Sequence, residues 1–558
     1  MAVAYSQEVI SRLLLTLWIM RFATAISLVS SAGPILAAAQ GEQTVLSDYD
    51  ANNEKLYRVA IVGAGMAGAS AALRLGSMST PSAPISVTVF DKESAGGGRV
   101  KTVSVPLPTF PKTAAEAGAP YFFASDWCLA LAMNHTNLSE ARSGTSQYSI
   151  PTIALWDGES LADGLRCNDE LPAYDLWWLR IFPYLPPPEW ARFVAEKTLR
   201  VLSVYLQLIR TSGLSLWRYQ VSAKSALAQW KAFGADGHRF EALEQGLSDV
   251  GLGAAVFRSA SSYLSGIGIA QGFADHRAEP CAVGLFSQRL GQIRGLASLI
   301  STQHSRRVAI EGGMVRLVEG MIERSRADLL LNTKVVAITP GAERRYRIAV
   351  ESESKTEDPV DVEFDSVIIA APLAGGLFDS ISSFQPYLSA TTPEYVETHV
   401  THFTSFSPLD PSFFGPQVNE SVPEAIVSLT DQQNIQAIRQ LPALFYLDPS
   451  CDDEDCDEII TQYLYRILSR GPVSNAELAS MIGRGWHEGD SLEQHDITWL
   501  HRQAWPHALP KYDGQPLPGN IEVAPGLFYI GSADEVVSSL EMACRSGRNA
   551  ADHVNLNT

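Results

Sequence analysis

The chain has 558 residues, of which 46% are hydrophobic and 18% are charged, so it has the length for two or more domains and the composition of a folded protein. Its formal net charge is -19, from 42 basic and 61 acidic residues. This charge argues against nucleic acid as a partner, because phosphate binding requires a basic surface. No spacing of cysteines and histidines predicts a metal site.

We expect an N-terminal secretory signal in residues 1–39. Two mostly apolar runs are separated by Arg21, and small residues follow up to Ala39. An uncleaved anchor is the alternative, but Arg21 and Pro34 keep the apolar run below the roughly 20 residues that a membrane span needs. We therefore expect cleavage near Ala39 and a polar linker over residues 40–56. The mature protein is then expected to be secreted or to lie in the lumen of the vacuole, lysosome or endoplasmic reticulum.

Six cysteines give only weak support for an oxidising compartment. Cys451 and Cys456 bracket an acidic loop and could pair across it. The other four are scattered in sequence, and their pairing stays open: Cys128, Cys167, Cys281 and Cys544. Nothing in the sequence marks Cys544, near the last predicted helix, as a covalent attachment site. Three sequons would carry glycans if the chain is secreted: Asn134, Asn137 and Asn419.

The stretch YRVAIVGAGMAGASAALRL, residues 57–75, predicts a buried strand, a glycine turn and an alanine-rich helix. Gly63 allows the tight turn, Gly65 lets a pyrophosphate approach the backbone, and Gly68 lets the helix pack close to the strand. The start of the helix would then face the phosphates with its positive dipole end. A strand-to-helix turn without a ligand is the alternative, because this glycine pattern alone is a weak signal.

The next strand, Ile85 to Asp91, ends in an acid that we expect to bind a ribose. The insertion at 76–84 explains why Asp91 lies somewhat further along the chain than usual. The loop AGGGRVKT, residues 95–102, follows the acid and is rich in glycine. A dinucleotide site is therefore favoured over a surface aspartate and a basic loop.

The middle of the chain has fewer clear signals. Residues 177–190 are rich in aromatic residues and proline, and apolar residues at helical spacing predict a helix over 186–210. A core helix is the simpler interpretation. The alternative is an apolar lid or lipid-facing surface around Trp177 and Trp178, which would allow peripheral membrane contact.

Nucleotide-fold patterns return in the second half. Gly312 and Gly313 precede a predicted helix, a strand covers 329–340, and an antiparallel pair covers 346–352 and 363–373. The last unit, 526–554, is a predicted strand, a loop with acids and serines, and a helix.

Gly97, Gly98 and Arg99 resemble the G-G-R loop of the amine-oxidase-like flavoproteins. That resemblance implies FAD as the cofactor, with Arg99 contacting its diphosphate. It also implies further cofactor contacts at four positions: the backbone of Val335 at the adenine, Gly531 near the ribitol, and Glu541 and Met542 at a helix start beneath the flavin.

Three segments are similar to a narrower family, the prenylcysteine oxidases or farnesylcysteine lyases. They are QRLGQIRG (288–295), RQAWPHALPKY (502–512) and SSLEMACRSGRNAA (538–551). The first has Leu290 before its Gly-Gln pair where the family has asparagine and tyrosine. The final loop is G-S-A-D-E where the family tends to G-I-E-C.

The resemblance implies oxidation of a thioether in a small lipophilic substrate. Hydride leaves the carbon next to sulfur for flavin N5, water adds, and the hemithioacetal collapses to a thiol and an aldehyde, while O2 becomes hydrogen peroxide. Three residues are candidates near the flavin: Trp505, His507 and Gln292. A core tryptophan and surface or structural polar residues are the alternatives.

Two other functions stay open at this point. One is a related FAD oxidase of a different small metabolite, and the other is a non-catalytic binder of prenyl groups. We expect an α/β fold, with a glutathione-reductase-like FAD domain and a substrate domain of helices and antiparallel sheet. The FAD domain is expected to combine residues 57–110, 305–375 and 501–558. The substrate domain is expected in 111–304, mainly helical, and 376–500.

Overall fold

The computed structural model describes most of the chain beyond the N-terminal segment. The described residues are 56–106, 113–141, 153–165, 167, 213–235, 238–302, 306–341, 345–352, 363–372, 393–415, 422–447, 459–517 and 519–556. Several sequence-based expectations lie outside them: the signal segment and linker, the aromatic stretch with its helix, the Cys451 to Cys456 loop and Asn419.

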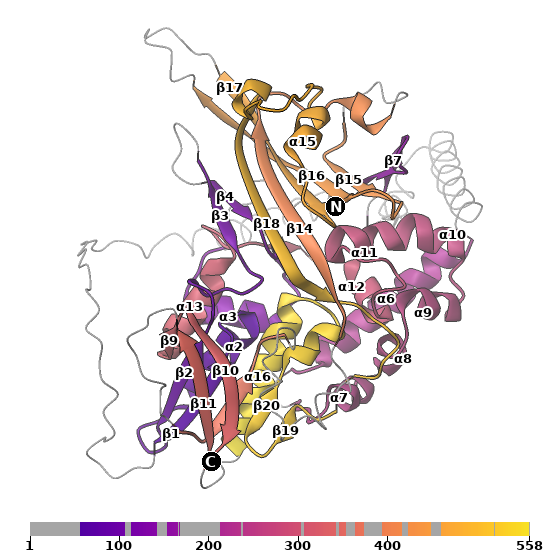
Figure 1. The fold of residues 1–558 in the computed structure, drawn as a ribbon. Helices are drawn as coiled ribbons and strands as arrows, with labels where there is room; N and C mark the ends of the chain where they lie inside the picture. The colour runs from indigo at the N-terminus through magenta and orange to yellow at the C-terminus, as the bar shows by residue number, and fades with distance from the viewer. Residues whose placement is uncertain are drawn as a thin grey trace, which may run out of the picture. The chain divides into compact units, whose positions relative to one another are not determined.

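A six-stranded sheet is assembled from three separate stretches of the chain (Figure 1). Its order is β19-β20-β13-β1-β2-β9, and every pairing is parallel except β19 with β20. The bounds are β1 Tyr57–Val62, β2 Ile85–Phe90, β9 Asp328–Leu330, β13 Ser366–Ile369, β19 Glu522–Ala524 and β20 Leu527–Tyr529. Val59, Ala60 and Ile61 in β1 are fully buried, because both faces of a parallel sheet are covered.

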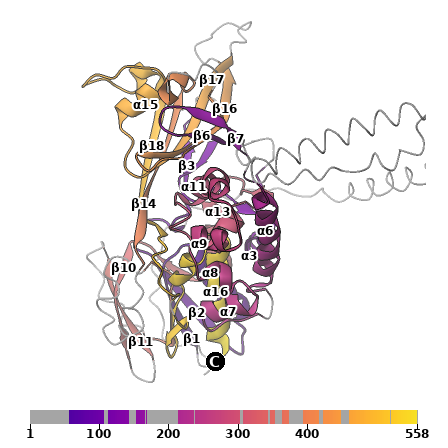
Figure 2. The same cartoon turned by 90° about the vertical axis from the view of Figure 1, so that its right-hand side faces the viewer.

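Four helices cover one face of this sheet. They are α2 (Met66–Met78), α3 (Trp127–Thr136), α13 (Val315–Ser325) and α16 (Leu540–Leu556), and their apolar residues share one core with Val59 and Ile61. The other face is covered by a three-stranded sheet of β10 (Thr333–Pro340), β11 (Tyr346–Ser352) and β12 (Glu363–Phe364), which packs on Ala60 and Val62. The result is a three-layer nucleotide-binding unit (Figure 2).

A seven-stranded sheet forms the second unit, in the order β18-β14-β17-β16-β15-β6-β7. Its strands are β6 Ile153–Trp156, β7 Leu161–Leu165, β14 Tyr395–Ser405, β15 Ala425–Ser428, β16 Ile435–Leu447, β17 Ile459–Ser469 and β18 Ile497–Pro510. All pairings are antiparallel except β15 with β6. The short helix α15 (Asn475–Met481) covers one face, where Phe403 and Tyr465 are fully buried.

Seven helices among the described residues form a third region with a core of its own. They are α6 Ser215–Ala232, α7 Leu243–Asp249, α8 Gly253–Val256, α9 Ala260–Gly266, α10 Gln271–Phe273, α11 Glu279–Phe286 and α12 Gly295–Ser301, with a π-helical turn at Ala274–Ala278. Val536, Val537 and Met542 belong to this core, so the C-terminal segment joins the helices to the nucleotide-binding unit. No helix among the described residues is long and apolar enough to cross a bilayer.

Two strand pairs connect the units. β3 (Thr102–Val105) pairs with β4 (Thr113–Glu116), and β5 (Phe122–Phe123) pairs with β8 (Arg307–Val308).

The segment boundaries differ from those expected in two places. The expected boundary at residue 500 falls inside β18, because residues 501–510 continue to pair with β14. Helix α3, expected in the substrate domain, shares the core of α2, α13 and α16. Strand continuation and helix packing are decided by tertiary contacts, which the sequence pattern did not show.

The four scattered cysteines form two disulfides. Cys128 in α3 is bonded to Cys544 in α16, 416 residues apart, and Cys167 is bonded to Cys281 in α11. Both pairs join stretches that are distant in sequence, which is why the spacing left their pairing open.

Candidate cofactor and substrate site

The first glycine motif contains two glycines that the fold requires and one that it does not. Gly63 has φ +108°, and a Cβ on Gly68 would lie 2.0 Å from the Gly63 carbonyl oxygen. Gly65 has φ -81°, and the nearest atom to a Cβ there would be Gly98 Cα, at 3.8 Å. The space at Gly65 lies at the start of α2, where a pyrophosphate would bind. No packing contact within the described part of the chain explains the missing side chain, so this cradle fits a dinucleotide.

The second glycine loop adjoins the first. The backbone nitrogen of Gly97 donates to the Ala64 carbonyl at 2.9 Å, and Gly65 bridges to Gly97. Gly97 and Gly98 both have positive φ, +126° and +57°, which glycine adopts without strain. The two loops therefore form one glycine-lined surface, although they come from different stretches of the chain.

Asp91 follows β2 and lies beside the same turn. Its Oδ2 accepts a hydrogen bond from Ala64 N at 2.7 Å, and its Oδ1 accepts one from Glu93 N at 2.9 Å. Burial raises the pKa of this carboxyl, while the two backbone donors oppose that change. The Asp91 carbonyl accepts from Thr333 N at 2.8 Å, so β10, which carries Val335, begins next to the acid. Val335 is buried and pairs with Val350 of β11.

Arg99 points to the C-terminal unit. Its side chain forms an ion pair with Asp534 and donates to the Ala508 carbonyl at 2.8 Å. The adjacent Asp534 raises the pKa of Arg99 against the opposing effect of burial. Gly531 begins the same turn, and a Cβ there would lie 2.6 Å from the Tyr529 hydroxyl. Arg99 and Gly531 are thus brought to one place from sequence positions more than 400 residues apart.

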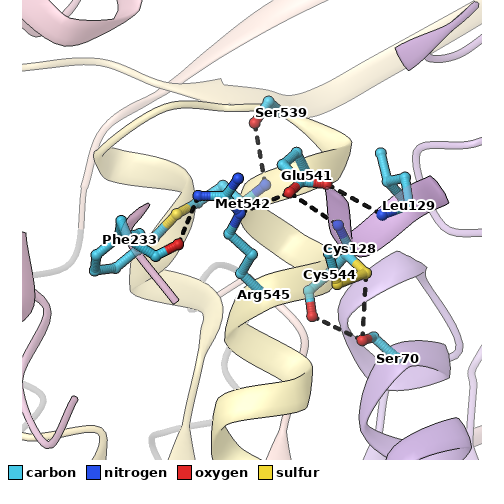
Figure 3. Close-up of a disulfide and its surroundings, with 9 residues drawn as sticks. All are labelled: Ser70, Cys128, Leu129, Phe233, Ser539, Glu541, Met542, Cys544 and Arg545. Carbon is cyan, nitrogen blue, oxygen red and sulfur yellow. Dashed lines mark hydrogen bonds and ion pairs between the residues drawn. A yellow bond between two sulfur atoms is a disulfide. The ribbon is translucent and has the colours of Figure 1, made fainter. Parts of the chain in front are cut away.

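Glu541 lies at the start of α16, as expected, but its side chain is used within the protein (Figure 3). It is 1% exposed, accepts from the backbone nitrogens of Cys128 and Leu129 at 3.1 Å, and pairs with Arg545 Nε at 2.6 Å. Arg545 is also buried and donates to the Phe233 carbonyl at 2.7 Å. The carboxylate therefore caps α3, and the backbone at the start of α16 is what remains for a cofactor.

Met542 and Cys544 also point into the protein. Met542 is fully buried in the core of the helical region, and its backbone nitrogen donates to Ser539 Oγ at 3.1 Å. The Cys544 sulfur is bonded to Cys128, and Ser70 Oγ donates to the Cys544 carbonyl at 2.7 Å. A covalent link from Cys544 to a cofactor would require this disulfide to open.

The three candidate residues near the reaction site lie in different surroundings. Trp505 on β18 is half-buried, and its Nε1 donates to the Ala117 carbonyl at 2.9 Å. His507 is exposed and packs edge-on against Tyr395, with ring centroids 5.5 Å apart. Gln292 accepts from Arg289 N at 3.0 Å. Trp505 suits a pocket wall, whereas His507 has the surroundings of a surface residue.

A small cleft lies between the segment before α12 and the C-terminal turn. Its lining includes Gln288, Gln292, Arg294, Tyr512, Asp534 and Glu535. Arg294 is 3% exposed and donates to the carbonyls of Val256 and Glu535, both at 2.8 Å. Burial raises the pKa of Glu535 to about 7, with Arg294 opposing the change. Gln292 and Asp534 therefore line one cleft, and Asp534 is the partner of Arg99.

Sequence reasoning missed the buried acid Glu116. It is 5% exposed and accepts from Met314 N and Thr102 Oγ1, each at 2.8 Å. Burial raises its pKa to about 7. Its surroundings in the sequence, A-E-A-G, carry no signal for a buried carboxyl, so only the pairing of β4 with β3 reveals it. Among the described residues, no cluster of His, Cys, Asp or Glu could hold a metal ion.

The three-layer nucleotide-binding unit and its joined glycine loops, together with the family match that follows, define the class of this protein, a flavin-dependent oxidoreductase. The family model for prenylcysteine lyase matches residues 195–556, and the chain belongs to that family. The model for an NAD(P)-binding Rossmann-like domain matches residues 61–131, which include both glycine loops. The resemblance found in the sequence and the expected fold class are confirmed.

Known relatives span nearly the whole chain. Farnesylcysteine lyase of Arabidopsis thaliana is 24% identical, covering 95% of this chain and 94% of that protein. A solved cofactor-binding variant of putrescine oxidase is similar with a TM-score of 0.52 and 12% identity, over 90% of this chain and 99% of that one. A fatty acid isomerase from P. acnes gives a TM-score of 0.50 and 12% identity, over 90% and 98%. The two structures support the fold.

Proposed function

We propose that this protein is an FAD-dependent oxidase that cleaves the thioether of a prenylcysteine-like substrate. One thioether, one water and one O2 would give one thiol, one aldehyde and one hydrogen peroxide. The observation that carries the proposal is the membership of residues 195–556 in the prenylcysteine lyase family, together with the open cradle at Gly65. The similarity to the Arabidopsis farnesylcysteine lyase over 95% of the chain supports the substrate class.

The residues present fit FAD. The backbone around Gly65 and Gly98 would hold the pyrophosphate, and Asp91 would accept from a ribose hydroxyl with the lone pairs left by its two backbone donors. Arg99 directly follows Gly98 in the second glycine loop, and its guanidinium would exchange part of its contact with Asp534 for a phosphate oxygen.

FAD, when bound, supplies the acceptor for the hydride and the route of both electrons to O2. The chain supplies binding and orientation. The start of α16 presents the positive end of a 17-residue helix, which favours negative charge nearby. Trp505, fixed by Ala117, would form an apolar wall for the substrate. Loss of hydride next to sulfur needs no strong base, and we assign none to His507.

We also propose passage through the secretory pathway. The two disulfides are typical of an oxidising compartment. Asn134 and Asn137 are exposed at the end of α3, so both sequons are accessible to glycosylation. A small lipophilic substrate and O2 are the proposed partners, with no nucleic acid.

Product analysis tests the proposal. The purified protein is incubated with FAD and its FAD content is measured; it is then mixed with S-farnesylcysteine in air, and cysteine, farnesal and hydrogen peroxide are quantified. We expect the three products in equal amounts. Peroxide formation with other small metabolites but not with farnesylcysteine would favour an oxidase of another substrate. A protein that binds farnesylcysteine but neither binds FAD nor forms products would indicate a non-catalytic prenyl binder.

A further inference from the structure

One row of the seven-stranded sheet carries basic side chains on four adjacent strands, and we call it the basic row: His501, His402, Arg466 and Arg439. His501 on β18 is opposite His402 on β14, His402 is opposite Arg466 on β17, and Arg466 is opposite Arg439 on β16. Directly opposed side chains lie about 5 Å apart at Cβ, and like charges at such positions destabilise a sheet. This arrangement therefore needs a physical reason.

The basic row faces the inside of the protein. Phe403, Tyr465 and Ile438, each next in sequence to a member of the row, are buried on the face covered by α15. Successive residues of a strand alternate between faces, so the row lies on the opposite face. On that face, Leu441 and Leu464 pack against Val105 and Ala115 of the β3–β4 pair. The β3–β4 pair, which directly follows the second glycine loop, thus packs on the face that carries the row.

A single backbone segment, residues 118–119, lies between the row and the loop expected to bind the flavin cofactor. Arg466 Nη2 donates to the Gly118 carbonyl at 3.2 Å. The next residue, Ala119, donates from its backbone nitrogen to the Arg99 carbonyl at 3.1 Å. The segment that Arg466 contacts therefore runs directly beside the G-G-R loop, and a substrate over this segment would reach both the row and the flavin.

Among the described residues around the row, arginines outnumber carboxyl groups, although the chain carries a net charge of -19. Arg307 adds a third arginine, and its guanidinium lies over the Tyr121 ring at 4.5 Å from the centroid. Burial is the main cause that lowers the pKa of Arg439 to about 10, and the charges of Arg307 and Arg466 contribute to this lowering. Glu424 acts to raise the pKa of Arg439, and Arg466 acts to lower the pKa of Glu116. Glu116 is already bonded to Met314 N and Thr102 Oγ1.

His402 gives a second, independent sign of a ligand. It is fully buried, and neither of its ring nitrogens has a hydrogen-bond partner among the described residues. Burial, Arg466 and His501 all lower its pKa, so its ring stays neutral. A buried polar ring without a partner is costly unless another molecule supplies one.

We propose that the basic row binds the carboxylate of the substrate, with Arg439 and Arg466 as its principal anchors. This deepens the proposed function, because it makes the substrate an amphipathic thioether with a free carboxyl group and excludes its ester. Planar guanidinium groups match a carboxylate in geometry and are the residues best suited to bind one. The bound anion would also relieve the repulsion across the row.

Paired substrates test this assignment. S-farnesylcysteine and S-farnesylcysteamine carry the same thioether, but only the first has a carboxylate. We expect the wild-type protein to prefer farnesylcysteine in kcat/KM by about 10- to 100-fold, the range of a charge-assisted contact. Arg439→Gln should lower kcat/KM for farnesylcysteine far more than for farnesylcysteamine, so that most of the preference is lost. Arg470→Gln, which changes an arginine bonded to Asp431 outside the row, should keep the preference.

Equal loss for both compounds in Arg439→Gln, or no preference in the wild type, would overturn the assignment and leave the oxidase intact. If the wild type oxidises neither compound, the proposed function fails, and a binding experiment then tests whether the row binds a carboxylate. Thermal stabilisation is then compared with dodecanoate and with dodecanol. Stabilisation by dodecanoate alone, lost in Arg439→Gln, would support the anion site without the reaction. Equal or absent effects would reject it.

Discussion

Gly65 differs from Gly63 and Gly68 in the reason why a glycine stands at its position. Gly63 needs its positive φ, and Gly68 has no room for a methyl group. Gly65 has ordinary backbone angles and open space, so the fold itself does not require a glycine there, and we propose that a bound pyrophosphate does. The motif itself could be identified from the sequence, but this division of roles depends on distances that only the assembled fold provides.

Gly65→Ala should therefore separate folding from cofactor binding. The added methyl group meets no protein atom closer than 3.8 Å, so the apoprotein should keep its thermal stability. It would occupy the space of the pyrophosphate, and we expect FAD affinity to fall by at least about tenfold, equivalent to about 1.4 kcal/mol. Gly68→Ala is the control and should destabilise the fold itself. Unchanged FAD affinity in Gly65→Ala would contradict the cradle.

Glu116 should make stability depend on pH. Its pKa of about 7 in the folded chain lies above the ordinary value of 4.5, so the folded state binds the proton more tightly than the unfolded state. Its contribution is then most favourable at low pH and is lost as the pH rises from about 4.5 to about 7. Glu116→Gln lacks this titration. The free energy of unfolding of wild type minus variant should fall by up to about 3 kcal/mol over that window.

Urea unfolding at several pH values between about 4 and 8 measures this difference. The matched control is Glu351→Gln, at an acid whose side chain is 70% exposed, and it should leave the pH profile of the wild type unchanged. A constant difference between wild type and Glu116→Gln across the window would show that the carboxyl is not perturbed.

At the scale of elements, α16 links the three regions. Its first turn caps α3 through Glu541, its Arg545 reaches the helical region at Phe233, and Cys544 is bonded to α3 (Figure 3). The sequence located this helix, and its position beneath a flavin stays a prediction from the family resemblance. It could not show that Glu541 turns to α3, because α3 is more than 400 residues away in the chain.

Removing the Cys128–Cys544 disulfide should affect both stability and cofactor binding. We expect Cys128→Ser with Cys544→Ser to cost about 2–4 kcal/mol, because the cross-link restricts the unfolded chain. FAD affinity should fall as well, since the start of α16 loses one of its attachments. Cys167→Ser with Cys281→Ser should lower stability but keep FAD affinity, because that bond lies at α11. Denaturant unfolding and FAD titration of both variants decide this, and equal effects on FAD would contradict it.

At the scale of the whole molecule, the nucleotide-binding unit is built from chain segments separated by the substrate-side regions. Strong local signals, the glycine turns and the buried strands, made its fold predictable. The extent of β18 and the position of α3 were not predictable, because partner strands and helices outside the local pattern decide them. The same applies to the basic row, whose members come from strands spread over 100 residues of sequence.

The central claim is that a prenylcysteine thioether gives its hydride to FAD in this protein. The most direct measurement is the absorbance spectrum of the FAD-loaded chain before and after S-farnesylcysteine is added without oxygen. We predict that the oxidised-flavin band at about 450 nm bleaches and returns when air is admitted. A band that persists after farnesylcysteine is added, in a protein that dithionite does bleach, would contradict the claim.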